Sequence, residues 1–73
     1  MTRPNNADIS KRFAKNLREV MTALGMNQST LSERTQLTQA CISQILSGQR
    51  EPLLSTVVKI MEVIPASFER LIK

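Results

Sequence analysis

The side chains that could do chemistry in this chain are amides, hydroxyls and cations, and they do not assemble into an active site. The sequence has no His and a single Cys, so neither a His-based catalytic triad nor a zinc site of Cys and His ligands can form. One thiol cannot close an intramolecular disulfide. No nucleophile is paired with a base, and no Gly-rich loop is available to cradle a phosphate. We therefore expect a protein that is not an enzyme and that uses no metal or cofactor.

The basic side chains are concentrated near the N-terminus. The chain carries ten Lys or Arg and six Asp or Glu, a net charge of +4. Residues 1–18 hold five of the basic residues and one acidic residue, whereas residues 19–73 hold five of each. A localised basic surface favours a polyanionic partner, most often through phosphates. A basic face that only keeps the protein in solution explains the charge equally well.

The length and hydropathy of the chain describe one small folded domain. Seventy-three residues with 41% hydrophobic content suffice for a single core and not for two. No apolar run is long enough to span a membrane, and residues 1–10 lack the apolar segment of a secretory signal. We therefore expect a cytoplasmic protein with no membrane partner.

Apolar residues recur at helical spacing, and no stretch alternates as a strand would. The first predicted helix covers residues 9–24, with Asp8 as its N-cap and Gly25 as its terminator. Its apolar stripe consists of Ile9, Phe13, Leu17, Val20, Met21 and Leu24. Residues 1–8 are expected to form a flexible arm, and residues 9–73 the folded domain.

Four shorter helices follow the first. They are predicted at residues 28–35, 39–46, 54–64 and 68–72. Asn27, Thr38 and Ser67 stand where N-caps are needed, and Pro65 stops the fourth helix. The predicted fold class is all-α, a compact five-helix domain.

The second and third helices, joined by only a few residues, have the spacing of a helix-turn-helix. Residues 25–52, GMNQSTLSERTQLTQACISQILSGQREP, resemble the lambda-repressor-like (XRE-type) helix-turn-helix DNA-binding family. The positions that match the family pattern are Gly25, Asn27, Gln28, Leu31, Leu37, Thr38, Ile42, Ser43, Ile45, Gly48 and Pro52. The resemblance extends over about residues 9–72. It implies that helix 39–46 is the recognition helix, which enters the major groove of double-stranded DNA.

The resemblance implies base-reading residues on helix 39–46. Gln39 opens this helix, where a side chain reaches base edges, and glutamine pairs with N6 and N7 of adenine. Gln44 lies about one and a half turns further on. Ala40 offers a methyl group for contact with thymine, and Ser43 is a weaker candidate. Without the motif, two glutamines on an exposed helix are ordinary solvated side chains.

Phosphate contacts are expected on both sides of the recognition helix. Gln28 resembles the family's glutamine that contacts a phosphate and braces the first residue of the recognition helix, here Gln39. Arg50 suits a phosphate contact, although a surface pair with Glu51 is an alternative. The expected phosphate-contacting residues are Gln28, Ser47, Gln49, Arg50, Arg3 and Lys11.

Two departures from the family pattern carry structural consequences. Gln36 occupies the turn position of a family glycine, which usually needs a positive φ, so Gln36 either costs about 1 kcal/mol or forces a different turn. Met21 and Leu46 occupy positions where the family often has a buried Arg and Glu. Replacing both partners of a buried ion pair with apolar residues is often neutral or stabilising. The paired change therefore supports the alignment.

The fourth predicted helix carries two apolar stripes. Val57, Ile60 and Ile64 face the core. A second stripe, formed by Leu54, Val58 and Met61, lies about 100° around the helix. An additional apolar face predicts a partner surface, although these residues would also fit a larger core. The expected homodimer interface comprises Leu54, Val58, Met61, Phe68, Leu71 and Ile72.

Together these features predict a sequence-specific regulator of transcription. We expect a repressor that binds a pseudo-palindromic operator as a homodimer. The size is similar to that of stand-alone phage, plasmid or restriction-system regulators and leaves no room for a sensor domain. The alternative is an antitoxin-type module whose apolar surface binds another protein, with DNA binding secondary.

Overall fold

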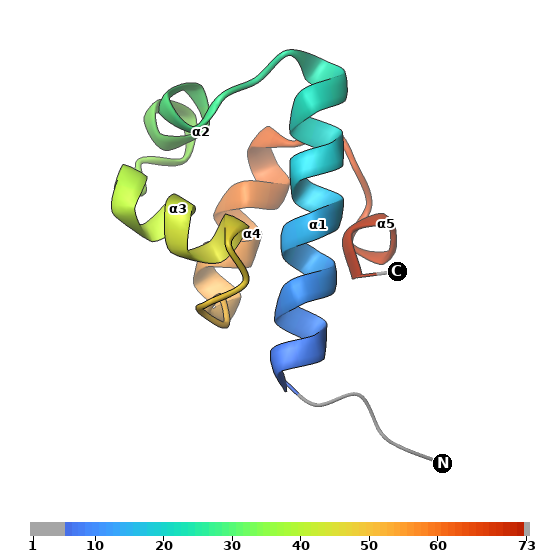
Figure 1. Cartoon of the computed structure of the whole chain (residues 1–73). Coiled ribbons are helices and arrows are strands. Elements are labelled where there is room, and N and C mark those ends of the chain that lie inside the picture. Colours follow the sequence, from blue (N-terminus) through green and yellow to red (C-terminus); the bar gives the residue numbers. More distant parts are fainter. Residues whose placement is uncertain (1–5, 73) are drawn as a thin grey trace.

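The structure is a computed structural model that describes residues 6–72, with side chains for residues 8–67 and 69–72. Its helices are α1 (Asn6–Leu24), α2 (Gln28–Thr35), α3 (Gln39–Leu46), α4 (Leu54–Val63) and α5 (Phe68–Ile72). Helix α1 runs along the molecule, with α5 on one side and α2, α3 and α4 on the other (Figure 1). No strand occurs within residues 6–72, so the predicted all-α fold of five helices is confirmed.

The ends of α1 match the prediction at one end only. The helix begins at Asn6, three residues before the predicted start, so Asp8 lies in the first turn. The prediction of Asp8 as N-cap is therefore wrong, although an acidic residue in the first turn still complements the helix dipole. At the other end, Gly25 has a φ of 66°, the left-handed conformation expected of the terminator.

The connection from α4 to α5 follows from Pro65 and Ser67. Helix α4 ends at Val63, because Ile64 is extended with φ −90° and ψ 121°. A residue before proline is forced away from the helical conformation, which the prediction of a helix through residue 64 did not take into account. Ser67 Oγ accepts a hydrogen bond from the Arg70 backbone N–H at 3.1 Å, so its predicted role as N-cap is confirmed.

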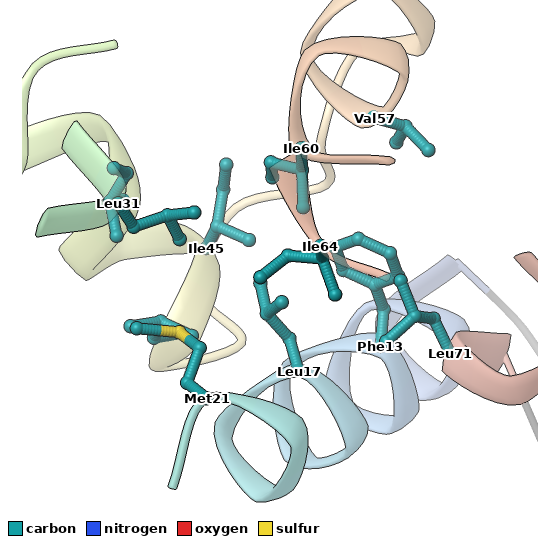
Figure 2. Close-up of a cluster of buried hydrophobic side chains, with 11 residues drawn as sticks. Phe13, Leu17, Met21, Leu31, Ile45, Val57, Ile60, Ile64 and Leu71 are labelled. Atoms are coloured by element: carbon teal, nitrogen blue, oxygen red, sulfur yellow. The ribbon is translucent and has the colours of Figure 1, made fainter. Parts of the chain in front are cut away.

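Side chains from all five helices form one core (Figure 2). Phe13, Leu17 and Met21 project inward from successive turns of α1 and belong to the same cluster as Ile45 of α3 and Leu71 of α5. The largest fully buried side chains are Leu17, Leu31, Ile42, Ile45, Ile60, Ile64 and Leu71. Helix α3 is thus fixed on its inner face, and its outer face remains available.

The ends of the predicted α1 stripe do not reach this core. Ile9 is 44% exposed and Leu24 is 47% exposed. A helix of this length extends beyond a small core, so its terminal apolar positions lie at the surface. The stripe is confirmed for its central turns and wrong at both ends.

Helix α5 is fastened to α1 by a buried hydrogen bond. Asn16 Nδ2 donates to the Leu71 carbonyl at 2.8 Å, and an exposed ion pair joins Arg70 to Glu19 at 3.6 Å. The Leu71 side chain is fully buried in the core. Its assignment to the dimer interface is therefore wrong, because it has no surface to offer. The Phe68 side chain, assigned to the same interface, lies outside the described residues.

Candidate nucleic-acid interface

The starts of α2 and α3 are fixed by side chains of the residues just before them. Asn27 Oδ1 accepts from the Thr30 backbone N–H at 2.8 Å. Thr38 Oγ1 accepts from the Cys41 backbone N–H at 3.1 Å. Both predicted N-caps are confirmed. Between the helices, Gln36 adopts φ 62° and ψ 22°, the left-handed conformation expected at this turn position.

Hydroxyl groups near the end of α2 bind the backbone of the turn. Ser32 Oγ donates to the Leu37 carbonyl. Thr35 Oγ1 donates to the Leu31 carbonyl at 2.7 Å and accepts from the Leu37 N–H at 3.3 Å. The two bonds to Leu37 satisfy turn groups that the helices leave unpaired. They hold α3 at a defined angle to α2.

The first residue of α3 projects from the surface and is tied to α2. The Gln39 side chain is exposed, and its Nε2 donates to Ser29 Oγ at 3.1 Å. The expected brace was Gln28, but the structure gives this contact to Ser29. Gln28 is exposed at the N-terminus of α2, where its amide is available for a phosphate.

The exposed face of α3 continues through the other predicted readers. Ala40, Ser43 and Gln44 are all exposed. Gln44 Oε1 accepts from Arg50 Nη1 at 3.4 Å, and the same Nη1 is 4.0 Å from Cys41 Sγ. Arg50 therefore folds back over α3 and adds a positive charge beside Gln44, one of the predicted readers.

The C-terminal end of α3 is bound by α1. Arg18 Nη1 donates to the Leu46 carbonyl at 2.8 Å, and a guanidinium at a helix C-terminus also complements the helix dipole. Met21 and Leu46 are only 4% and 6% exposed. Both line one hollow with Arg18, so the two positions that lack the family ion pair lie in the same part of the core.

The loop after α3 packs against α1 through a glycine. Gly48 has a φ of 77°, and a Cβ there would lie 3.2 Å from Lys11 Cγ and 3.5 Å from Lys11 Cα. Ser47 Oγ donates to the Gln44 carbonyl at 2.9 Å and accepts from the Gln49 N–H at 3.4 Å. Three predicted phosphate-contacting residues, Lys11, Ser47 and Gln49, are thus gathered at one end of α3. Arg3, a fourth, lies outside the described residues.

The predicted partner surface is largely exposed. Leu54 and Val58 are 78% and 48% exposed, and they line one hollow together with half-buried Met61. Leu54 also lines a second hollow, with half-buried Ile72 and with Ile9 of α1. The apolar surface therefore extends from α4 to the N-terminal part of α1.

Two residues of the interface were missed by reasoning from the sequence. No contact was predicted for Arg18, although it lies one turn before Met21, where the family's cation is absent. The missing cation at Met21 could have indicated that a nearby cation, Arg18, takes its place. Ser29 gave no signal, because its contact with Gln39 depends on the angle between α2 and α3.

A tight turn between two helices, the second of which presents exposed amides with Arg50 beside one of them, defines a helix-turn-helix DNA-binding domain. A family model described as Helix-turn-helix matches residues 17–71, from within α1 into α5. The chain belongs to this family, of the lambda-repressor (XRE) type, whose members are DNA-binding regulators of transcription. Comparisons with curated proteins and with solved structures gave no match. Among residues 6–72, no helix has the length and apolar character needed to cross a membrane.

Proposed function

We propose that the protein is a homodimeric transcriptional repressor that recognises a pseudo-palindromic operator through α3. The observation that carries the proposal is the first residue of α3, since Gln39 is exposed and is held on α2 by its bond to Ser29. An ordered amide at the N-terminus of a recognition helix is suited to reading a base edge in the major groove.

The remaining residues are assigned either to contacts with bases or to contacts with phosphates. We assign Gln44, Ala40 and Ser43 to the bases, because they share the exposed face of α3 with Gln39. The residues assigned to phosphates are Gln28, Ser47, Gln49, Arg50, Arg3 and Lys11. Exposed amide and hydroxyl groups on α3, with Arg50 and Lys11 near its C-terminal end, suit the division between base readout and backbone positioning.

Dimerisation is proposed through the apolar surface that exposed Leu54 and Val58 form with half-buried Met61 and Ile72. Apolar side chains this exposed on a small domain favour a partner surface. A second copy is the proposed occupant, because one domain reads too few base pairs to discriminate among genomic sites when each mismatch costs about 1–3 kcal/mol. A two-fold axis doubles the readout and sets the half-sites about one helical turn apart.

Repression then follows from occupancy. Two recognition helices in adjacent major grooves would exclude polymerase from an overlapping promoter. The proposed site of action is the cytoplasm of a prokaryotic cell, where the operator DNA is accessible.

Selection of bound duplexes from a pool with a randomised centre tests the proposed operator. The expected result is an enriched motif with two inverted half-sites, whose centres are about one helical turn apart. Enrichment of a single half-site without an inverted repeat would contradict the two-fold mode of binding. Failure to enrich any motif would contradict sequence-specific recognition.

The substitution Val58→Glu tests the dimer surface. Val58 is exposed enough for the fold to persist by circular dichroism, while a charge at the interface should remove the dimer in sedimentation and weaken operator binding at least about tenfold. Lys59→Glu, on another face of α4, is the control and should retain the dimer. If Val58→Glu still binds the selected duplex as a two-fold complex, the interface lies elsewhere. If wild-type protein is monomeric on and off DNA, the surface serves a different protein, as in the antitoxin alternative.

A further inference from the structure

We infer that Ser29 is a positioning residue that sets the base preference of Gln39. The inference rests on the proposed function, because it concerns how the proposed reader is oriented. The observation behind it is the hydrogen bond from Gln39 Nε2 to Ser29 Oγ, 3.1 Å long. It joins the second residue of α2 to the first residue of α3.

The backbones on both sides of this bond are fixed. The Asn27 cap orders the first turn of α2, and the bonds of Ser32 and Thr35 to the turn hold α3 against α2. Because both backbones are fixed, only the rotamers of the two side chains remain to be set, and Ser29 has a single χ1 torsion. The Ser29 hydroxyl favours the conformation in which the amide nitrogen points toward α2.

The bond leaves the Gln39 amide with the groups that adenine requires. A carboxamide nitrogen has two N–H donors, and Ser29 accepts from one. One N–H and the carbonyl oxygen remain, to donate to N7 and to accept from the N6 amino group of adenine. Without Ser29, ordering the flexible side chain would be deferred to the moment of binding, which lowers affinity for the correct base.

The second reader is held by a different group. Gln44 accepts through its oxygen from Arg50, so the loss of the Ser29 hydroxyl leaves that contact unchanged. The effect of Ser29 is therefore confined to the base pair that Gln39 reads, once in each half-site. A residue that merely stabilised α2 would alter binding to all sequences alike.

The test uses the duplex selected by the wild-type chain and a series in which each base pair is substituted in turn. Ser29→Ala should lower discrimination about three- to tenfold, the scale of ordering one side chain, at the same base pair that Gln39→Ala relaxes. Ser29→Thr, which keeps the hydroxyl, should retain the preference. In a Gln39→Ala background, Ser29→Ala should cause no further loss of discrimination.

Gln28→Ala is the matched comparison at the neighbouring position. It should weaken binding to all duplexes by a similar factor and leave the base preference unchanged. The inference is overturned if Ser29→Ala weakens all duplexes equally, or if its effect persists without Gln39. If Gln39→Ala relaxes no base pair, the proposed reading role fails and the inference fails with it. If Gln39→Ala relaxes a base pair and Ser29→Ala does not, only the role of Ser29 is rejected. Thermal unfolding followed by circular dichroism verifies that each variant is folded.

Discussion

The two ends of the recognition helix α3 are held by different kinds of contact. At its N-terminal end, Thr38 caps a backbone N–H three residues away, and Gln39 bonds to Ser29 ten residues away. At its C-terminal end, the Leu46 carbonyl accepts from Arg18, which is 28 residues away in the sequence. Gly48 packs against Lys11 of the same helix, α1.

The N-terminal end of α3 is therefore expected to recognise bases, whereas the C-terminal end holds the helix in place against α1. The N-terminal end is a local structure whose bonds lie within α2, the turn and α3. The C-terminal end is fixed by the tertiary packing of α1 against α3. Substitutions at the C-terminal end should therefore lower the free energy of unfolding most. Substitutions at the N-terminal end should cost less stability and act mainly on DNA recognition.

The largest effect is expected from Met21→Arg, which places a charge in the core where α1 meets α3. Met21 is 4% exposed and lines a hollow with Arg18, so the new cation is buried near a like charge. A loss of about 3–5 kcal/mol in the free energy of unfolding is expected by urea denaturation.

Leu46→Glu should partly rescue Met21→Arg. The new carboxylate supplies a partner across α1 and α3, so the double variant should be more stable than Met21→Arg alone. Leu46→Glu alone should cost less than Met21→Arg, since Arg18 lines the same hollow. Additive losses in the double-mutant cycle would mean that the two positions do not interact.

Arg18→Met should remove the contact that holds the Leu46 carbonyl. Hydrogen bonds to charged groups contribute about 1.5–3 kcal/mol, and partial exposure of the guanidinium lowers the expected loss to about 1–2 kcal/mol. Lys15→Met, on the same helix and exposed, is the control for charge and should change stability by less than about 0.5 kcal/mol. If the two variants change the denaturant midpoint equally, Arg18 does not stabilise α3 through its bond to Leu46.

Gly48→Ala tests the second contact between the end of α3 and α1. Both Gly48 and Gly25 have positive φ, but only a Cβ at Gly48 would meet another residue, at 3.2 Å from Lys11 Cγ. Gly25→Ala should therefore cost about 1 kcal/mol for the conformation alone. Gly48→Ala should cost more, by the amount needed to move Lys11. If Gly25→Ala proves at least as costly as Gly48→Ala, close packing at the loop is not important for stability.

The smallest effect on stability is expected at the local end of α3. Thr38→Ala removes the N-cap bond to the Cys41 N–H and should cost about 1 kcal/mol, as other caps do. Thr38→Ser keeps the acceptor and should restore most of this. A loss as large as that of Met21→Arg would show that the local end is not independent of the core.

The comparison of the two ends also explains what could be predicted from the sequence. Caps such as Asn27 and Thr38 depend on residues close in the chain, and both predictions are confirmed. At Gln36 the sequence left two alternatives, and the structure has the positive φ and not a different turn. Helical spacing also identified Val57, Ile60 and Ile64 as core residues, which they are. These features follow from local geometry, which the sequence determines directly.

Contacts between distant segments could not be predicted from the sequence. The Arg18 bond to Leu46 requires the distance between α1 and α3, and the burial of Leu71 requires the docking of α5 on α1. The exposure of Ile9 depends on where the core ends along α1. The brace on Gln39 was placed one residue away from Ser29, because the family pattern fixes the helix and not the rotamers on it.

The most direct test of α3 as the reading element is the effect of Gln39→Ala on two duplexes, the selected operator and a scrambled sequence of equal length. Binding is measured by fluorescence anisotropy at one salt concentration, because affinity for both duplexes depends on salt. A loss of about 1–3 kcal/mol on the operator, with no change on the scrambled duplex, is the expected result. An equal loss on both duplexes would contradict base reading by Gln39.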